Sequence, residues 1–527
     1  MANVFFYFCD IYISIKDVYV LSKRLFIINT FLLTFTTVFL RLIGMFFRIY
    51  LSNKIGTEGM GLYQLILSVY MVFISFANAG ISVSVTRLVS ENMDKYHSHK
   101  IVTKTLLYQL GIGTLTAVCL YVISGMLCSI FLKDTRIVSA LKVISLSLPF
   151  IAMSSCFKGF FIAKSKVIKT TTAQILEDIV KIAIIFVIID AYIDKGLDKT
   201  CVAIAIGTAL SEIVSWGYLG ALYVFDKGKT INSNKKPPSN IIGNMLHISL
   251  PLAGSAYITS SLKLVENMLI PSSLQSYGMN ISTSLSQYGM LKGMALPLIL
   301  FPSALLTAFS TLLVPEITKA KMSGRNNLIR YTLDRVCKFT MLVSILICGL
   351  FIVFSGELGN VIYSNAEVGY IIKILSPLVP FIYLDGSITG ILMGLDKQKS
   401  IFLYNTIDSV GRIILMYILI PTYGFNGLIW VMYLSNILLP SAYLFKVSSV
   451  TGLKMNVMDY LIKPVVSAGV SCAVGYFIVS MLNVYNGISF LGIGVLTISS
   501  VYLALLVAIK CVTKDDVNWI VKSVKRN

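Results

Sequence analysis

Two arginines lie seven residues apart in one apolar run of the chain: Arg41 and Arg48, within residues 25–50. Seven residues make about two turns of an α-helix, so both side chains leave from the same helix face. The run contains no Asp or Glu that could neutralise them. A planar guanidinium binds phosphate oxygens through two parallel hydrogen bonds. The pair therefore indicates contact with a phosphate-bearing anion, and a structural ion pair with distant acids is the alternative.

Lys292, near the start of the apolar run 287–315, likewise has no acid close to it in the sequence. Several other charges inside apolar runs have an opposite charge three or four residues away, a spacing that places both on one helix face and favours an intrahelical ion pair. The expected pairs are Glu177 with Lys181, Lys263 with Glu266, and Asp408 with Arg412.

The composition determines what kind of chain positions these charges. Of 527 residues, 56% are hydrophobic and only 13% are charged, against about 25% charged in an ordinary soluble domain. Too few polar residues remain to cover a water-soluble globule. The net charge of +20 would suggest nucleic acid in a soluble protein. In so apolar a chain it indicates basic cytoplasmic loops instead, and we expect no nucleic-acid partner.

The apolar runs predict about fourteen transmembrane helices, because a span needs about 20 predominantly apolar residues. Prolines inside several runs can kink their helices; they are Pro149, Pro251, Pro297, Pro302, Pro377 and Pro380. The runs are residues 25–50, 62–86, 105–131, 137–157, 170–190, 200–225, 244–271, 287–315, 336–355, 368–394, 400–420, 427–446, 463–482 and 489–511.

The distribution of Lys and Arg supports this threading. Of 44 such residues, 31 fall in or at the edges of the segments on one side, five in loops on the other side, and eight within the spans. Lys and Arg concentrate in cytoplasmic loops. We therefore expect a multi-pass protein of the cytoplasmic membrane with both termini in the cytoplasm.

The polar, basic stretch Asp226–Gly243 divides the spans into six before it and eight after. The two sides resemble each other at a constant offset, at which Gly159 aligns with Gly390 and Lys166 with Lys397. Six is even, so both halves enter the membrane in the same direction. We expect an N-lobe with its linker over residues 25–243, a C-lobe over residues 244–448, and two further spans with a basic tail over residues 449–527.

Residues 1–24 form a separate N-terminal segment that we place in the cytoplasm. Met1–Val20 is aromatic and apolar but too short to span. Either translation starts at Val20 or Leu21 and these residues are extra, or they form an amphipathic helix on the inner leaflet.

Motifs of enzymes and motors are missing from the sequence. There is no P-loop, HExxH or GxSxG motif. No His or Cys cluster has metal-ligand spacing. We expect a protein that is not an enzyme and has no metal site and no cofactor. Transport against a gradient would then depend on a Na⁺ or H⁺ gradient or on the membrane potential, which supplies about 2.3 kcal/mol per charge per 100 mV.

Five segments resemble the stage V sporulation protein B family of the multidrug/oligosaccharidyl-lipid/polysaccharide exporter superfamily. They are Arg41–Met45, Ile55–Leu65, Ala79–Ser82 with Arg87, Tyr288–Leu298, and Val314–Ile317. The resemblance covers residues 21–515. It implies an all-α, V-shaped exporter fold of two six-helix lobes plus two C-terminal helices.

The resemblance also implies a function and a set of site residues. The protein would flip an undecaprenyl-diphosphate-linked saccharide or peptidoglycan precursor by alternating access, for spore cortex or cell-wall polysaccharide assembly. In related lipid II flippases, cations from spans one, two and eight line the cavity. Arg41 matches the first span-one arginine and Lys292 the span-eight arginine. Arg48 lies one residue out of register, and the span-two arginine has no counterpart. We include Lys263 among the expected substrate-binding residues.

Some of those relatives hold sodium between spans seven, eleven and twelve, and the positions here would be Glu266, Asn405 and Asp408. The expected partners are a lipid-linked anionic sugar, membrane lipids and proteins of cell-wall synthesis. Two other functions remain open. A drug/cation antiporter of the same superfamily would require an acidic cavity, and a non-transporting scaffold would have cavity charges that are expendable.

Overall fold

The computed structural model describes residues 2–78, 80–91, 95–129, 134–227, 240–452, 456–481, 487–513 and 515–516. Over these residues every regular element is a helix and no strand forms. The side chains of residues 1–35 are not among those described, so the alternative start and the inner-leaflet placement predicted for Met1–Val20 stay predictions.

The helices of the first half follow one another with short connections. They are α1 (Ala2–Asn78), α2 (Ile81–Glu91), α3 (Lys95–Leu127), α4 (Val138–Ser145), α5 (Leu148–Ala163), α6 (Val167–Ile193) and α7 (Leu197–Lys227).

The second half has more and shorter helices. They are α8 (Ile241–Ser276), α9 (Ile281–Tyr288), the π-helical η2 (Gly289–Ala295), α10 (Leu296–Leu300), α11 (Ser303–Met322), α12 (Asn326–Val353), α13 (Ser355–Tyr363), α14 (Ala366–Leu375), the 3₁₀ turn η3 (Ser376–Leu378), α15 (Val379–Gly394), α16 (Gln398–Tyr423), α17 (Phe425–Thr451), the π-helical η4 (Met458–Ile462), α18 (Lys463–Met481) and α19 (Gly487–Ala508).

Each of the fourteen predicted runs lies mainly on helix. Among the described residues, ten helices are long and apolar enough to cross a membrane, or eleven when α4 and α5, which meet at a bend of 40°, count as one span. The range Val38–Glu91 is counted as one of these ten helices. It nevertheless contains a break, because α1 leaves helical geometry at Gly56 (φ 70°, ψ −174°). The protein is therefore a multi-pass membrane protein, and the figure of fourteen stays a prediction.

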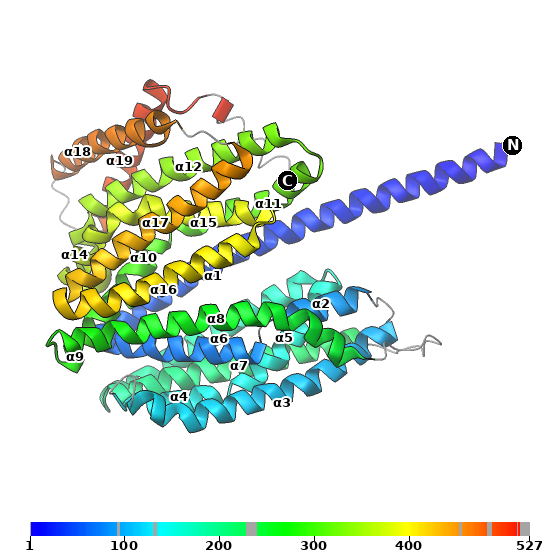
Figure 1. The fold of residues 1–527 in the computed structure, drawn as a ribbon, viewed down its shortest axis with the longest axis horizontal. Coiled ribbons are helices and arrows are strands. Elements are labelled where there is room, and N and C mark those ends of the chain that lie inside the picture. The colour runs from blue at the N-terminus through cyan, green and yellow to red at the C-terminus, as the bar shows by residue number, and fades with distance from the viewer. Residues whose placement is uncertain are drawn as a thin grey trace.

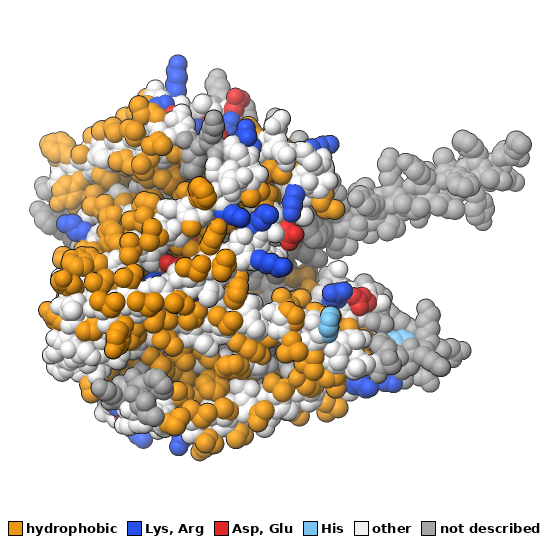
Figure 2. Space-filling view, viewed as in Figure 1, with side chains coloured by type: hydrophobic (Ala, Val, Ile, Leu, Met, Phe, Trp, Pro, Cys, Tyr) orange, Lys and Arg blue, Asp and Glu red, His pale blue; other side chains and the backbone are white. Residues whose placement is uncertain are grey.

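The helices form two groups that diverge from one end, as in a V (Figure 1). Helices α3–α7 pack on one another in one group, and α11, α12 and α15–α17 do so in the other. Helix α8 lies between the groups, in contact with both α1 and α16. The last two helices, α18 and α19, pair with each other on α12. Figure 2 shows hydrophobic side chains over much of one face, as expected for helices bordered by lipid.

The repeat predicted from sequence recurs in the helix boundaries. Helices α15 and α5 begin and end at equivalent positions of the repeat, and α16 begins where α6 does. The turns that join these helices are equivalent too. Ser165 and Asp396, which also align, both adopt left-handed backbone with φ of 56° and 58°. The Lys166 amide donates to Phe161, as the Lys397 amide does to Leu392. The weak sequence repeat therefore corresponds to a repeated local structure.

Prolines account for most of the breaks within predicted spans. A proline has no N–H to donate to the carbonyl four residues earlier, so the helix bends or changes its winding there. Pro149 lies at the start of α5, Pro302 between α10 and α11, and Pro377 in η3. Pro251, by contrast, lies inside the continuous helix α8. Five of the six prolines predicted to kink spans stand at helix boundaries in the structure: Pro149, Pro297, Pro302, Pro377 and Pro380.

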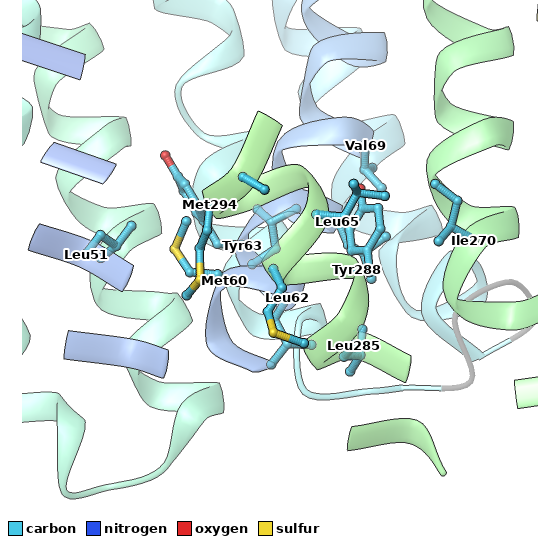
Figure 3. Packing of buried hydrophobic residues seen from close by; sticks show 14 of the residues in the cluster. Leu51, Met60, Leu62, Tyr63, Leu65, Val69, Ile270, Leu285, Tyr288 and Met294 are labelled. Carbon is cyan, nitrogen blue, oxygen red and sulfur yellow. The ribbon is translucent and has the colours of Figure 1, made fainter. Parts of the chain in front are cut away.

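The two groups of helices meet tightly at one end of the bundle, which we call the Gly56 end. There the segment of α1 after Gly56 packs against α9 and η2. A Cβ on Gly289 would lie 2.0 Å from the Thr57 carbonyl oxygen, and one on Gly61 would lie 2.2 Å from the Leu285 carbonyl oxygen. Only hydrogen fits at either position. Around these glycines a buried apolar cluster forms, including Leu62, Leu65, Leu285 and Tyr288 (Figure 3).

Polar contacts reinforce the Gly56 end. Glu58 pairs with the Arg136 guanidinium at 2.8 Å and accepts a hydrogen bond from Ser282 of α9 at 2.6 Å. Asn53 donates to the Ile362 carbonyl of α13 at 3.2 Å. Residues from the two halves of the chain are thereby joined, and α1 is fixed to helices of the second half.

Gly289→Ala tests the glycine contact. The added methyl group forces backbone apart, and overpacking of this kind costs about 1–3 kcal/mol. We expect a lower melting temperature for the purified variant. Gly217→Ala is the matched control, because a Cβ at Gly217 meets nothing within 4 Å and alanine favours the helix by up to about 1 kcal/mol. Equal stability of the two variants would contradict the contact.

Candidate functional site: a cationic cavity

A cavity of about 650 Å³ lies between α1 and the helices η2, α10, α11 and α15. Its charged lining comes from three places in the chain. Helix α1 contributes Arg41 and Arg48, η2 contributes Lys292, and α15 contributes Asp385. The rest of the lining is mostly apolar or small and consists of Gly44, Met45, Leu296, Pro297, Leu300, Phe301, Ser303, Thr307, Ile382 and Gly386.

The structure thus brings Arg41, Arg48 and Lys292 together, although Lys292 belongs to the other half of the chain. Among the described residues, no carboxylate oxygen lies within 4.0 Å, the limit for an ion pair, of a charged nitrogen of Arg41, Arg48 or Lys292. Arg41 is exposed, and Arg48 and Lys292 are partly buried. Within the described part of the chain, these three cations therefore face the cavity without an ion-paired acid.

The position of Lys292 follows from the local sequence. Pro297 has no N–H for the Gly293 carbonyl, and the chain just before it winds as the π-helix Gly289–Ala295. Such π-helical segments frequently occur at functional sites. Two buried tyrosines fix the segment. Tyr363 donates a hydrogen bond to the Met294 carbonyl at 3.1 Å, and Tyr383 donates to the Ile299 carbonyl at 2.7 Å. These bonds hold the backbone that follows Lys292, whose side chain lines the cavity.

Asp385 is a lining residue that the sequence analysis did not assign to the site. No described group donates a hydrogen bond to its carboxylate, and its Oδ1 is buried. The criterion that selected the arginines would also have found it, because no basic residue lies within four positions of Asp385 in the sequence. The described lining carries three cations and one carboxylate, an excess of two positive charges.

A second charged cluster lies beside the cavity, between α8 and α16. The Arg412 guanidinium is 3.3 Å from the buried Glu266 carboxylate and 3.0 Å from the Asp408 carboxylate. Ser435 of α17 donates to Asp408 at 2.7 Å. Glu266 and Arg412 also act electrostatically on Lys292. The cluster joins three helices and adjoins the cationic wall of the cavity.

These contacts correct two of the three expected ion pairs. Asp408 does pair with Arg412. Glu266 pairs with Arg412 of another helix and not with Lys263, because α16 lies directly against α8. Lys181 pairs with Asp178, three residues before it, and not with Glu177. The spacing in the sequence allowed Lys181 to pair with either acid of α6. It could not show that α16 packs against α8 and brings Arg412 to Glu266.

Two further residues named from sequence lie apart from these contacts. Lys263 is exposed on α8 and does not line the cavity, although its charge acts on Lys292. Asn405, one turn before Asp408 on α16, makes no hydrogen bond to Glu266 or Asp408 within the described residues. Over the same residues, no group of three His, Cys, Asp or Glu side chains is arranged to hold a metal ion.

The sequence model of the family described as "Polysaccharide biosynthesis protein" matches residues 26–321, more than half of the chain. The chain belongs to this family. The match begins in the span that carries Arg41 and ends in α11, so it includes most of the cavity wall. Asp385 lies beyond the matched residues.

Known proteins agree with this membership. The chain is 23% identical to stage V sporulation protein B of Bacillus subtilis over 493 residues, which cover 90% of this chain and 94% of that protein. It is 25% identical to the lipid II flippase MurJ of the same organism, over 73% of this chain and 76% of that protein.

A solved structure of lipid II flippase MurJ in an inward closed conformation has the same fold, with a TM-score of 0.68, 17% identity, and coverage of 91% of this chain and 98% of that one. The sequence-based assignments of an all-α V-shaped exporter fold and of the exporter superfamily are confirmed. This family member is a multi-pass membrane protein related to transporters.

Arg412→Gln tests the α8–α16 cluster. Removing the guanidinium leaves Glu266 buried without its cation, and breaking a buried ion pair costs about 3–5 kcal/mol. We expect a clear fall in the melting temperature of the purified protein, with Arg412→Lys retaining most of the stability. Arg87→Gln is the control, because Arg87 pairs with Glu91 on an exposed surface where such pairs contribute about 0–1 kcal/mol. Equal melting of Arg412→Gln and Arg87→Gln would contradict a stabilising role.

Proposed function

We propose that the protein is a flippase for an undecaprenyl-diphosphate-linked saccharide or peptidoglycan precursor. It would move this substrate across the cytoplasmic membrane by alternating access and would serve spore cortex or cell-wall polysaccharide assembly. In this proposal it is a transporter and not an enzyme, with both termini in the cytoplasm. Its partners are the lipid-linked substrate, membrane lipids and proteins of cell-wall synthesis.

One observation supports the proposal most strongly: Arg41, Arg48 and Lys292 line one cavity, and among the described residues no acid pairs with them. An ionisable group at the centre of a membrane costs about 2.5–3.5 kcal/mol on insertion scales. Three such groups of one sign remain favourable only with water or an anion beside them. Guanidinium groups and an ammonium are the donors that proteins use for phosphate oxygens.

The charge count of the cavity agrees with a diphosphate. A diphosphate esterified at both ends carries two negative charges, and the described lining has an excess of two positive charges. A positively charged drug would enter against that excess. The relatives support the same substrate class, since one of them is named for lipid II. These arguments favour the flippase over the drug/cation antiporter.

Alternating access requires the two groups of helices to part at the Gly56 end. In this structure that end is closed by the glycine contacts and by the Ser282–Glu58 and Asn53–Ile362 hydrogen bonds, which join the two halves of the chain. Exposed hydrogen bonds are individually weak. We propose that they separate in each transport cycle while the helix groups move largely as rigid bodies.

We propose that uphill flipping is coupled to a Na⁺ or H⁺ gradient or to the membrane potential, with Glu266, Asn405 and Asp408 as candidate ion ligands. Arg412 lies between the two carboxylates and supplies the positive charge there in this conformation. An external cation would therefore have to displace the guanidinium. Proteoliposomes with imposed Na⁺, H⁺ or electrical gradients would identify the driving force.

Neutralising the cavity cations tests the flippase proposal. Arg41→Gln, Arg48→Gln and Lys292→Gln each remove one contact to the anion, and hydrogen bonds to charged groups contribute about 1.5–3 kcal/mol. We expect binding of undecaprenyl diphosphate to weaken about tenfold or more in each variant, measured by native mass spectrometry of the purified protein.

Lipid extracted with the wild-type protein provides the complementary readout. The proposal predicts a co-purifying lipid diphosphate that is depleted in the three variants and retained in Arg87→Gln. Co-purification of ordinary phospholipids alone, together with unchanged binding in all variants, would favour the scaffold. Retention of cationic compounds instead would favour the antiporter.

A further inference from the structure

Asp385 has a place in the cavity that phosphate binding does not explain. It lies on α15, at a different wall from the cations, which come from α1 and η2. No cationic nitrogen of Arg41, Arg48 or Lys292 comes within 4.0 Å of its carboxylate over the described residues. The charges that act on it are those of Asp408 and Arg412 of α16. The cavity is therefore polarised, with cations at one wall and a carboxylate at another.

The carboxylate has unused capacity for hydrogen bonds. A carboxylate offers about four acceptor sites, and no described group donates to either oxygen of Asp385. A partly buried acceptor without a donor costs about 1–3 kcal/mol. The neighbouring Gly386 lets α15 pack closely on α11 beside this carboxylate, since a Cβ there would lie only 2.8 Å from the Thr307 methyl group. A ligand with several donors would relieve the cost.

The excess positive charge of the cavity decides which donors fit. A free cation held by Asp385 would face three positive charges across the cavity, so a neutral donor is favoured. Hydroxyl and amide N–H groups of a saccharide are neutral, and they are joined covalently to the phosphates in a lipid-linked sugar. A diphosphate at Arg41, Arg48 and Lys292 would leave its attached sugar to extend toward another wall of the same 650 Å³ cavity.

We propose that Asp385 recognises the saccharide: its carboxylate accepts hydrogen bonds from hydroxyl or amide groups of the sugar attached to the diphosphate. This inference rests on the proposed function and deepens it. The cations bind any lipid diphosphate, and Asp385 discriminates carriers loaded with sugar from empty ones. A site built to hydrogen-bond its ligand rejects an analogue that lacks those groups far more strongly than an apolar pocket does.

The test uses the purified full-length protein and two probes of equal charge, each with a diphosphate esterified at both ends: undecaprenyl methyl diphosphate and undecaprenyl diphosphate carrying N-acetylglucosamine. Native mass spectrometry of the protein with an equimolar mixture gives the ratio of the two bound species. We expect the wild type to prefer the sugar-bearing lipid by about tenfold, the value for one or two hydrogen bonds to a charged acceptor.

In Asp385→Ala the ratio should fall to about one, while total lipid bound stays the same or rises. Asp385→Asn keeps the shape of the side chain and one acceptor oxygen, and it should give an intermediate ratio. If the alanine variant does not fold, the ratio measured for Asp385→Asn provides the test. Asp396→Asn is the matched control, because this acid lies just after the same helix and is largely exposed. It should keep the wild-type ratio.

The outcomes separate the two proposals. Binding of neither lipid by the wild type would overturn the proposed function. Equal binding of both lipids by the wild type, or an unchanged preference in Asp385→Ala and Asp385→Asn, would overturn the role of Asp385 and leave the diphosphate site standing.

Discussion

Positive charge without a neighbouring negative charge, inside an apolar bundle, is the constraint that shapes this structure. Each such group costs about 2.5–3.5 kcal/mol in mid-membrane, and water or an anion must offset that cost. The fold accommodates the cations by leaving a cavity between its two groups of helices and by directing Arg41, Arg48 and Lys292 to it. In the adjacent cluster, by contrast, the Glu266 and Asp408 carboxylates both pair with the Arg412 guanidinium, and this difference marks the cavity as the place for a ligand.

Helix interruptions provide the geometry that this constraint demands. Regular α-helices would present smooth apolar surfaces to one another. Here Pro297 ends a π-helical turn that carries Lys292, and Gly56 divides α1 so that the chain can return along the bundle. The glycine contacts at Gly61 and Gly289 then close one end. The same elements position the site and form the contact that must open for transport.

Local sequence patterns were sufficient for part of this account. Apolar runs located the helices, unpaired charges located three of the four charged lining residues, and the alignment of Gly159 with Gly390 located the repeat. Motif resemblance supplied the fold. Patterns within one helix could not reveal contacts between helices. The pairing of Glu266 with Arg412 depends on how α8 packs against α16. Asp385 was visible as an unpaired acid, but only the packing of α15 against α11 places it in the wall of the same cavity as the cations. The short helix α13 and the break at Gly56 were not predicted either.

The most direct test of the central claim is an experimental map of the protein with a bound lipid-linked diphosphate. The account predicts density for the two phosphate groups at the wall formed by Arg41, Arg48 and Lys292, with donor nitrogens about 2.7–3.2 Å from phosphate oxygens. Phosphate density elsewhere in the protein, with these three side chains paired to acids or turned away from the cavity, would contradict it.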